Sequence, residues 1–408
     1  MTGETDAAVR RGRVLLDLGR AREAEALFRT ALAADPGDPV LHTLLARALL
    51  RQEKYPEARD AGRTALAAAP EYVLAHSTLA AALAGLGEHA AALDAVRDGL
   101  GLEPEAAGLH VQEAYVLMAQ RRNAEALDST RRARMLAPDD ADVAAAQAAA
   151  LLELQRLDEA EAAVHDALRL DPQNLDAHRV RGLLALRRGG GRPAVQAHRT
   201  AMRLDPTDEG IREGLSYALK SRNPLYGLLL RMSMWLNAQP KALRWGFLLL
   251  PFLLTRLLRP FEGELWADVL LVVVVALVLL SWTLEPLMNL VLLCTRDRHL
   301  LTRAARLATF RFVAFAGAAI AVAVLGTVWG PSRLLSLAFG LGLWAMAVGS
   351  AHALAAKPRR ILVTGSWVAG AVAVLAFAAT VGGVSGAVPA VMLVFLSGIA
   401  ATWFAVLS

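Results

Sequence analysis

The chain has 408 residues, of which 55% are hydrophobic and 20% charged, with a formal net charge of +5 and a mean hydropathy of +0.39. Residues 1–223 hold 29 basic and 33 acidic side chains, whereas the remainder holds 14 basic and only 5 acidic ones. The pI near 9.7 therefore reflects the second half alone and does not indicate nucleic-acid binding. A single cysteine, Cys294, excludes disulfides within the chain and cysteine-rich zinc sites.

A 34-residue repeat runs through the first half of the chain. An alanine stands twelve residues before each repeated proline, and Ala or Gly stands five and twenty-four residues before it. Small side chains let helices pack closely, and proline ends a helix. Each unit is therefore expected to be a pair of antiparallel helices that buries its apolar stripe by stacking on the next pair. The prolines are Pro36, Pro70, Pro104, Pro138, Pro172 and Pro206.

These units resemble tetratricopeptide repeats, which have the same length and the same order of small and proline positions. The resemblance covers residues 5–208 and implies an all-α solenoid of six repeats, which a closing helix at 209–221 would complete as a domain over residues 1–223. The second-helix Phe of the family survives only as Phe28. The family's early Trp is replaced by Ala8, His42, His76, His110, Ala144 and His178. We expect these histidines to pack, because successive repeats lie too far apart for two of them to share a zinc ion.

The resemblance also implies a binding groove on the concave face, which the first helix of each unit forms. A middle that is small and apolar, with basic ends, favours an extended or helical peptide with apolar anchors as the partner. The alternative is that this face is solvated or packs on a neighbour. Carried over by position, the groove residues are Arg47, Ala81, Val111, Tyr115, Met118 and Arg179.

From residue 224 onward the sequence changes to long apolar runs. Residues 224–241 include LYGLLLRMSMWL, which is too short to span a bilayer and is typical of an amphipathic helix on the membrane surface. A membrane span needs about 20 mainly apolar residues. Residues 242–408 contain several runs of this length, so we expect them to form an α-helical membrane domain. Five spans are expected at 266–284, 307–329, 334–355, 361–381 and 387–407, and a sixth at 242–261 is ambiguous because its apolar centre is short.

Loop charge favours six spans over five. If 242–261 spans, eleven Lys and Arg side chains lie on the side of the N-terminus and three on the other; otherwise the numbers are six and eight. Because Lys and Arg stay cytoplasmic and the N-terminus lacks a secretory signal, both termini and the repeats are expected in the cytoplasm. Arg outnumbers Lys 39 to 4 in an Ala-rich background, which is typical of a GC-rich bacterial genome. The expected location is the bacterial inner (plasma) membrane, with several spans.

Two polar side chains, Glu285 and Asn289, lie with Pro286 at the inner end of the 266–284 span. Ionisable groups within a membrane are costly, and they are therefore functional candidates. The alternative is that Glu285 is solvated at the level of the lipid headgroups. The segment SWTLEPLMNLVLL is similar to segments of uncharacterised bacterial membrane proteins that carry these repeats.

No catalytic residue, metal ligand or cofactor is expected. Ser366 and His352 do not match an intramembrane serine protease, because no Gly follows the serine. We expect a membrane-anchored scaffold whose groove recruits a protein or peptide to the inner membrane. The alternative is a transporter or channel subunit regulated by the repeats, although the last three spans offer almost no polar side chains for a pathway. Association with another membrane protein stays open.

Overall fold

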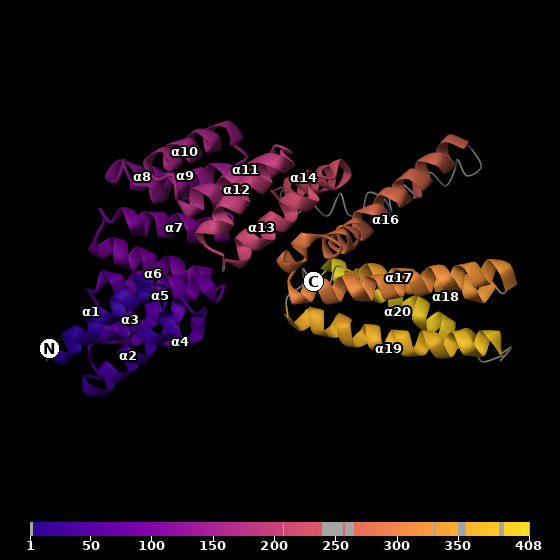
Figure 1. Ribbon diagram of the computed structural model, residues 1–408, viewed down its shortest axis with the longest axis horizontal. Helices are drawn as coiled ribbons and strands as arrows, with labels where there is room; N and C mark the ends of the chain where they lie inside the picture. The colour runs from indigo at the N-terminus through magenta and orange to yellow at the C-terminus, as the bar shows by residue number, and fades with distance from the viewer. Residues whose placement is uncertain are drawn as a thin grey trace. The chain divides into compact units, whose positions relative to one another are not determined.

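The computed structural model describes residues 3–206, 208–238, 256–257, 265–329, 332–349, 356–382 and 387–407 (Figure 1). Every regular element in these ranges is helical. They divide into two compact units, one made of Met1–Leu184 and Gln196–Thr207 and the other of Ala185–Val195 and Asp208–Ser408. The expectation of an all-α chain is confirmed for the described residues.

Helices α1 to α12 form six successive pairs in chain order (Figure 1). From α1 to α10 each helix packs on the one that follows it, and the first helices α3, α5, α7 and α9 also contact one another in series. This is the expected stacking of tetratricopeptide-like pairs. The helices are α1 Gly3–Asp17, α2 Ala21–Ala34, α3 Pro39–Leu50, α4 Tyr55–Ala68, α5 Val73–Gly85, α6 His89–Leu102, α7 Ala107–Ala119, α8 Asn123–Leu136, α9 Ala141–Glu153, α10 Leu157–Leu170, α11 Leu175–Arg187 and α12 Gly191–Leu204.

The small residues that mark the repeat lie at the helix crossings. All three small positions in each of the six units are buried. Those twelve residues before the repeated proline have no exposed surface, namely Ala24, Ala58, Ala92, Ala126, Ala160 and Ala194. A larger side chain at such a position would push two helices apart, which explains why the positions stay small.

Two of the pairs use glycine where the other four use alanine, and the reason is a large side chain on the second helix. A Cβ on Gly12 would stand 2.3 Å from the ring of Phe28, and a Cβ on Gly182 would stand 2.5 Å from the ring of His198. In the pair formed by α9 and α10, the corresponding residues are Ala148 and Val164, both buried. In these three pairs the volume is therefore shared between the two helices of the repeat.

The turn inside each pair has the same backbone geometry throughout. A carbonyl in the last turn of the first helix accepts from the residue after the turn, as Leu49 accepts from Lys54 at 3.0 Å, which is the hydrogen bond of a Schellman motif. The turn residue has a positive φ in all six pairs. It is glycine at Gly19, Gly87 and Gly189, but Glu53, Arg121 and Gln155 adopt φ values of 59°, 61° and 62°. These three side chains hold a left-handed conformation that favours glycine.

The four histidines at the expected Trp position pack, but they also make a hydrogen bond. Nε2 of each lies 2.8 or 2.9 Å from the carbonyl oxygen of the repeated proline six residues earlier, so Nε2–H donates to a carbonyl of the preceding connection. Packing alone therefore does not account for these residues. Each histidine ties the start of its repeat to the end of the previous one; they are His42, His76, His110 and His178.

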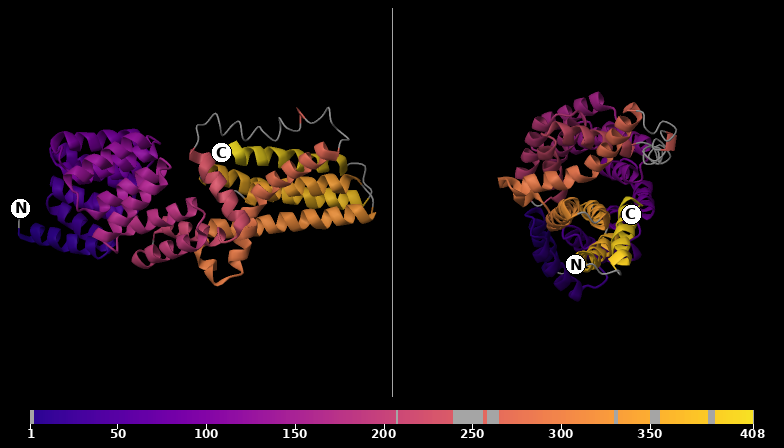
Figure 2. Two further views of the ribbon diagram at one scale, coloured as in Figure 1. Left: turned by 90° about the horizontal axis from the view of Figure 1, so that it is seen from above. Right: turned by 90° about the vertical axis from the view of Figure 1, so that its right-hand side faces the viewer.

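The second unit includes α13 (Glu209–Lys220) and α14 (Pro224–Ala238). The expected closing helix is α13, and it contacts α16 and the short 3-10 helix η2; α14 contacts α16 as well. The other elements are α16 Leu265–Leu293, η2 Arg296–Leu300, α17 Arg303–Trp329, α18 Ser332–Gly349, α19 Ala356–Val381 and α20 Ala387–Leu407. Helices α17 to α20 lie side by side around a core that includes Leu337, Trp344 and Val394 (Figure 1, Figure 2).

Two helices in the described residues, Arg303–Val328 and Arg360–Val381, are long and apolar enough to cross a membrane. They correspond to the expected spans 307–329 and 361–381. The apolar stretches Arg333–Gly349 and Val388–Ala401 are shorter, and they fall within the expected spans 334–355 and 387–407. Helix α16 contains the expected span 266–284. The ambiguous span 242–261 lies outside the described residues apart from Arg256 and Leu257.

Candidate functional site

The expected groove residues all lie on first helices of the repeat pairs. Arg47 is on α3, Ala81 on α5 and Arg179 on α11, and α7 carries Val111, Tyr115 and Met118. Arg47 is exposed and the other five are half-buried. These side chains therefore keep some surface through which a ligand could be contacted.

A polar cluster surrounds Tyr115 and joins three successive first helices. Asn174 donates to the carboxylate of Asp142 at 2.6 Å, and Arg179 donates to Asp176 at 2.8 Å. Burial raises the pKa of the Tyr115 hydroxyl most strongly, and the carboxylates of Asp176 and Asp142 raise it further, whereas Arg179 lowers it. The hydroxyl is thus a neutral donor at physiological pH, next to two carboxylates and a guanidinium.

The groove is therefore more polar than the residues assigned to it by resemblance to the repeat family indicate. Ser77 on α5 donates to the side-chain oxygen of Gln112 on α7 at 2.9 Å, and the Gln112 amide donates back to the Ser77 carbonyl at 2.8 Å. Asp142 and Asp176 were not singled out from the sequence, although they stand 34 residues apart at the same place in successive repeats. That spacing was the available signal.

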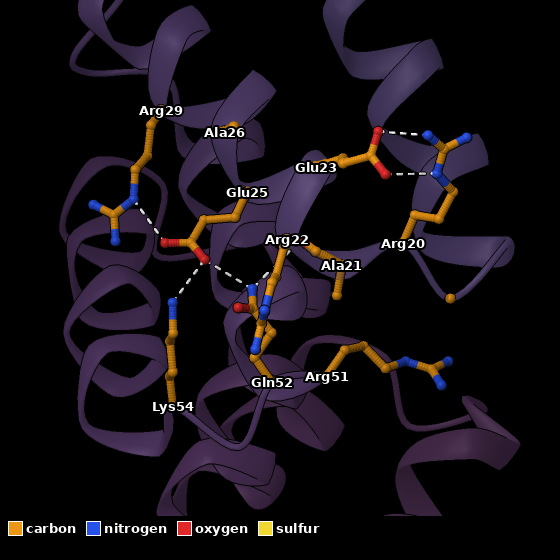
Figure 3. Close-up of a pocket in the computed structure, with 11 residues that line it drawn as sticks. Arg20, Ala21, Arg22, Glu23, Glu25, Ala26, Arg29, Arg51, Gln52 and Lys54 are labelled. Atoms are coloured by element: carbon orange, nitrogen blue, oxygen red, sulfur yellow. Dashed lines mark hydrogen bonds and ion pairs between the residues drawn. The ribbon is translucent and has the colours of Figure 1, made fainter. Parts of the chain in front are cut away.

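A separate cleft of about 900 Å³ lies at the turns of the first two repeats, and Figure 3 shows its side chains. Glu25 is its centre, since it accepts from Lys54 at 2.9 Å, Gln52 at 2.8 Å and Arg29 at 2.9 Å (Figure 3). Burial raises the pKa of Glu25, but these three hydrogen bonds outweigh burial and lower it to about 2.

The charge left in this cleft is positive. Glu23 is held by the Nε and Nη2 atoms of Arg20, at 2.7 and 2.6 Å, so both carboxylates of the cleft are paired. Arg22 and Arg51 also line the cleft with exposed side chains. This cleft was not identified from the sequence, although Arg20 and Lys54 stand 34 residues apart at the same place in successive repeats. The paired carboxylates give it the character of a structural ion network.

One member of the expected polar pair on α16, Glu285, contacts a side chain that the sequence did not suggest. The Nζ atom of Lys220 lies 3.6 Å from Oε1 of Glu285. Asn289, one turn further along α16, is 1% exposed, and neither its oxygen nor its nitrogen has a hydrogen-bond partner among the described residues. Glu285 is therefore paired with a cation rather than left to solvent alone.

Ser366, which the sequence analysis compared with a protease serine, makes a hydrogen bond within its own helix. Ser366 is 3% exposed, and its hydroxyl donates to the carbonyl of Val363 at 2.7 Å. His352, its proposed partner, lies outside the described residues.

Comparison with known proteins supports the repeats. A profile of the family described as tetratricopeptide repeat matches residues 9–73 and 145–197. The chain is similar to a solved thermophilic TPR protein of Thermus thermophilus, TTC0263, at 30% identity over 42% of this chain and 94% of that one, with a TM-score of 0.40. It is similar to pilF of Pseudomonas aeruginosa at 20% identity over 52% and 96%, with a TM-score of 0.40. YrrB, described as a TPR protein with an unusual peptide-binding site, shares 19% identity over 46% and 96%, with a TM-score of 0.32. Comparison with curated proteins gives no match.

Proposed function

The repeat half of the chain belongs to the tetratricopeptide-repeat family, and on that premise we propose that the protein is a membrane-anchored scaffold. Proteins with these repeats generally mediate protein–protein interaction. The observation that carries the proposal is the face formed by the first helices, where six groove residues keep exposed surface beside the Tyr115 cluster. A partner protein or peptide would bind there through apolar contacts to Val111 and Met118 and hydrogen bonds to Tyr115 and Arg179.

The outer surface of α17 to α20 supports membrane insertion of the second half. Large apolar side chains are exposed there, including Phe310 at 60%, Val328 at 72% and Trp367 at 71%. Soluble monomers rarely expose such a contiguous apolar surface. Lipid chains would cover it. We propose six spans in the inner membrane with both termini in the cytoplasm. This arrangement keeps most Lys and Arg side chains on the cytoplasmic side.

Close packing between α18 and α20 also favours a rigid anchor. A Cβ on Gly340 would stand 3.0 Å from the backbone of Phe395, and a Cβ on Gly398 would stand 2.9 Å from the carbonyl oxygen of Gly340. Small residues allow helix backbones to approach in this way within a bilayer. A packed bundle of this kind is consistent with an anchor and leaves little room for a pathway between these two helices.

A transporter or channel subunit regulated by the repeats is the second candidate. The buried Asn289 amide favours it, because a polar side chain that lacks a partner among the described residues could contact a substrate or water. In that case Asn289→Leu would stop substrate flux, whereas a scaffold would keep its partner.

The test substitutes two groove residues and compares the proteins that are crosslinked to each variant. Full-length protein carrying Tyr115→Glu and Met118→Glu is crosslinked in native membranes, purified and analysed by mass spectrometry. Loss of a partner that wild type retains is expected, with unchanged membrane abundance. The matched control carries Arg63→Glu and Arg132→Glu, which place two acidic side chains on exposed positions of the second helices α4 and α8. Equal partner sets for the groove variant and wild type would refute the groove.

A further inference from the structure

Lys220 is a buried cation enclosed by three helices of the second unit. It ends α13, and only 3% of its surface is exposed. Its Nζ atom lies 5.2 Å from the ring centre of Tyr217 on α13 and 5.8 Å from that of Tyr226 on α14. On the remaining side stands Glu285 of α16, at 3.6 Å. Two aromatic faces and one carboxylate therefore surround a single ammonium group.

The groups around Lys220 favour its charged form, whereas its burial opposes that form. Burial lowers the pKa of Lys220, while the carboxylate of Glu285 acts in the opposite direction and favours the charged form. Burial also raises the pKa of Tyr217 to about 12, so its ring faces Lys220 as a neutral phenol. Aromatic faces attract an ammonium group within about 6 Å.

A buried ion pair is not needed for stability alone. Apolar side chains of similar volume often stabilise such a site as well or better, whereas removal of one charged partner leaves the other uncompensated. What the pair provides is a specific docking geometry, because the ammonium reaches its carboxylate only when α13 and α16 are in one register. The electrostatic pairing therefore selects that register from other apolar arrangements.

The carboxylate side of the pair is connected to the apolar helices. Pro286 follows Glu285 within α16 and has no amide hydrogen to donate. A Cβ on Gly349 of α18 would stand 2.7 Å from Pro286 Cγ, so α18 packs directly on this turn. A change in the position of Glu285 would therefore be felt by both α16 and α18.

We infer that Lys220, Tyr217, Tyr226 and Glu285 form a polar joint within the second unit that docks α13 onto α16 and holds these two helices in one register. The joint is an interaction surface inside the chain, and Glu285 acts there as the partner of Lys220. This role is independent of which ligand occupies the groove.

The test is a double-mutant cycle on the full chain in lipid nanodiscs. Hydrogen–deuterium exchange of α13 amides is measured for wild type, Lys220→Met, Glu285→Gln and the double variant, and each rate is divided by that of α5 amides. Arg222→Met, which removes an exposed cation two residues after Lys220, is the matched control. The α5 reference corrects for differences in exchange conditions between samples.

Each single variant is expected to speed α13 exchange at least tenfold, because each breaks the ion pair of the joint. The double variant is expected to exchange no faster than the faster single variant, and Arg222→Met as wild type. Multiplication of the two single effects in the double variant would show that the residues act independently and would overturn the joint. Wild-type exchange in either single variant would overturn it equally.

Discussion

Replacing the strained turn residues of the repeats by glycine should stabilise the solenoid. Glu53 and Gln155 keep exposed surface at their turns and hold φ values of 59° and 62°. A non-glycine residue in this region costs about 1–2 kcal/mol relative to an unstrained backbone. Glycine loses about 0.5–1 kcal/mol more in conformational entropy on folding, which offsets part of the gain. The net stabilisation expected for Glu53→Gly or Gln155→Gly is therefore about 0.5–1 kcal/mol each.

The effect should be local, because each repeat contacts only its neighbours. A gain of about 0.7 kcal/mol corresponds to roughly threefold slower hydrogen exchange, given that about 1.4 kcal/mol is tenfold. We expect this slowing in α3 and α4 for Glu53→Gly, measured on the full-length protein, and none in α9 and α10. The two sites are far apart in the stack, so their effects should add in the double variant.

A reverse substitution separates backbone strain from side-chain contacts. Gly87 has a φ of +78°, and a Cβ there would meet nothing within 4 Å. Gly87→Ala should therefore destabilise by about 1 kcal/mol through the backbone alone. If Gly87→Ala has no effect, or if Glu53→Gly destabilises as an interior helical glycine does, strain at the turn is not the reason for the preference.

Three further predictions concern single residues of the repeats, each measured by urea unfolding of the full-length protein. Gly182→Ala should destabilise the protein by about 1–3 kcal/mol through overpacking. Adding His198→Val should relieve this loss, because Ala148 and Val164 form the same pair one repeat earlier. If the double variant is no more stable than Gly182→Ala, the shared-volume argument is wrong. Burial, aided by the charge of Arg179, lowers the pKa of His198 to about 4. The unfolded chain then binds a proton first, so stability should fall by roughly 3 kcal/mol as pH drops from about 6.5 to about 4, and His198→Phe should flatten that window. Glu25 has its pKa lowered to about 2, so its contribution, roughly 2 kcal/mol after allowance for solvent screening, should be complete above about pH 4.5 and lost as pH falls towards about 2; an unchanged profile in Glu25→Gln would refute this.

The sequence by itself determined the repeat architecture. A period of 34 residues with three small positions per unit records contacts that every unit makes with its neighbours, and identical contacts leave identical marks in the sequence. The same periodicity placed Arg47, Tyr115 and Arg179 on first helices. It could also have identified Asp142 and Asp176, which share one position in successive repeats.

Only the tertiary structure decided which side chains meet outside that periodicity. Gly182 is small because His198 is large, a compensation between two positions that the repeat pattern treats separately. The ion pair of Lys220 and Glu285 joins residues that are 65 positions apart in the sequence. Lys220 comes before the change to apolar composition at residue 224, and Glu285 comes after it. No spacing rule connects them, since a non-repeated contact occurs once and leaves no period. Helix α13 could be predicted as a helix from its apolar face, but its docking on α16 depended on a charge whose partner lies in another segment.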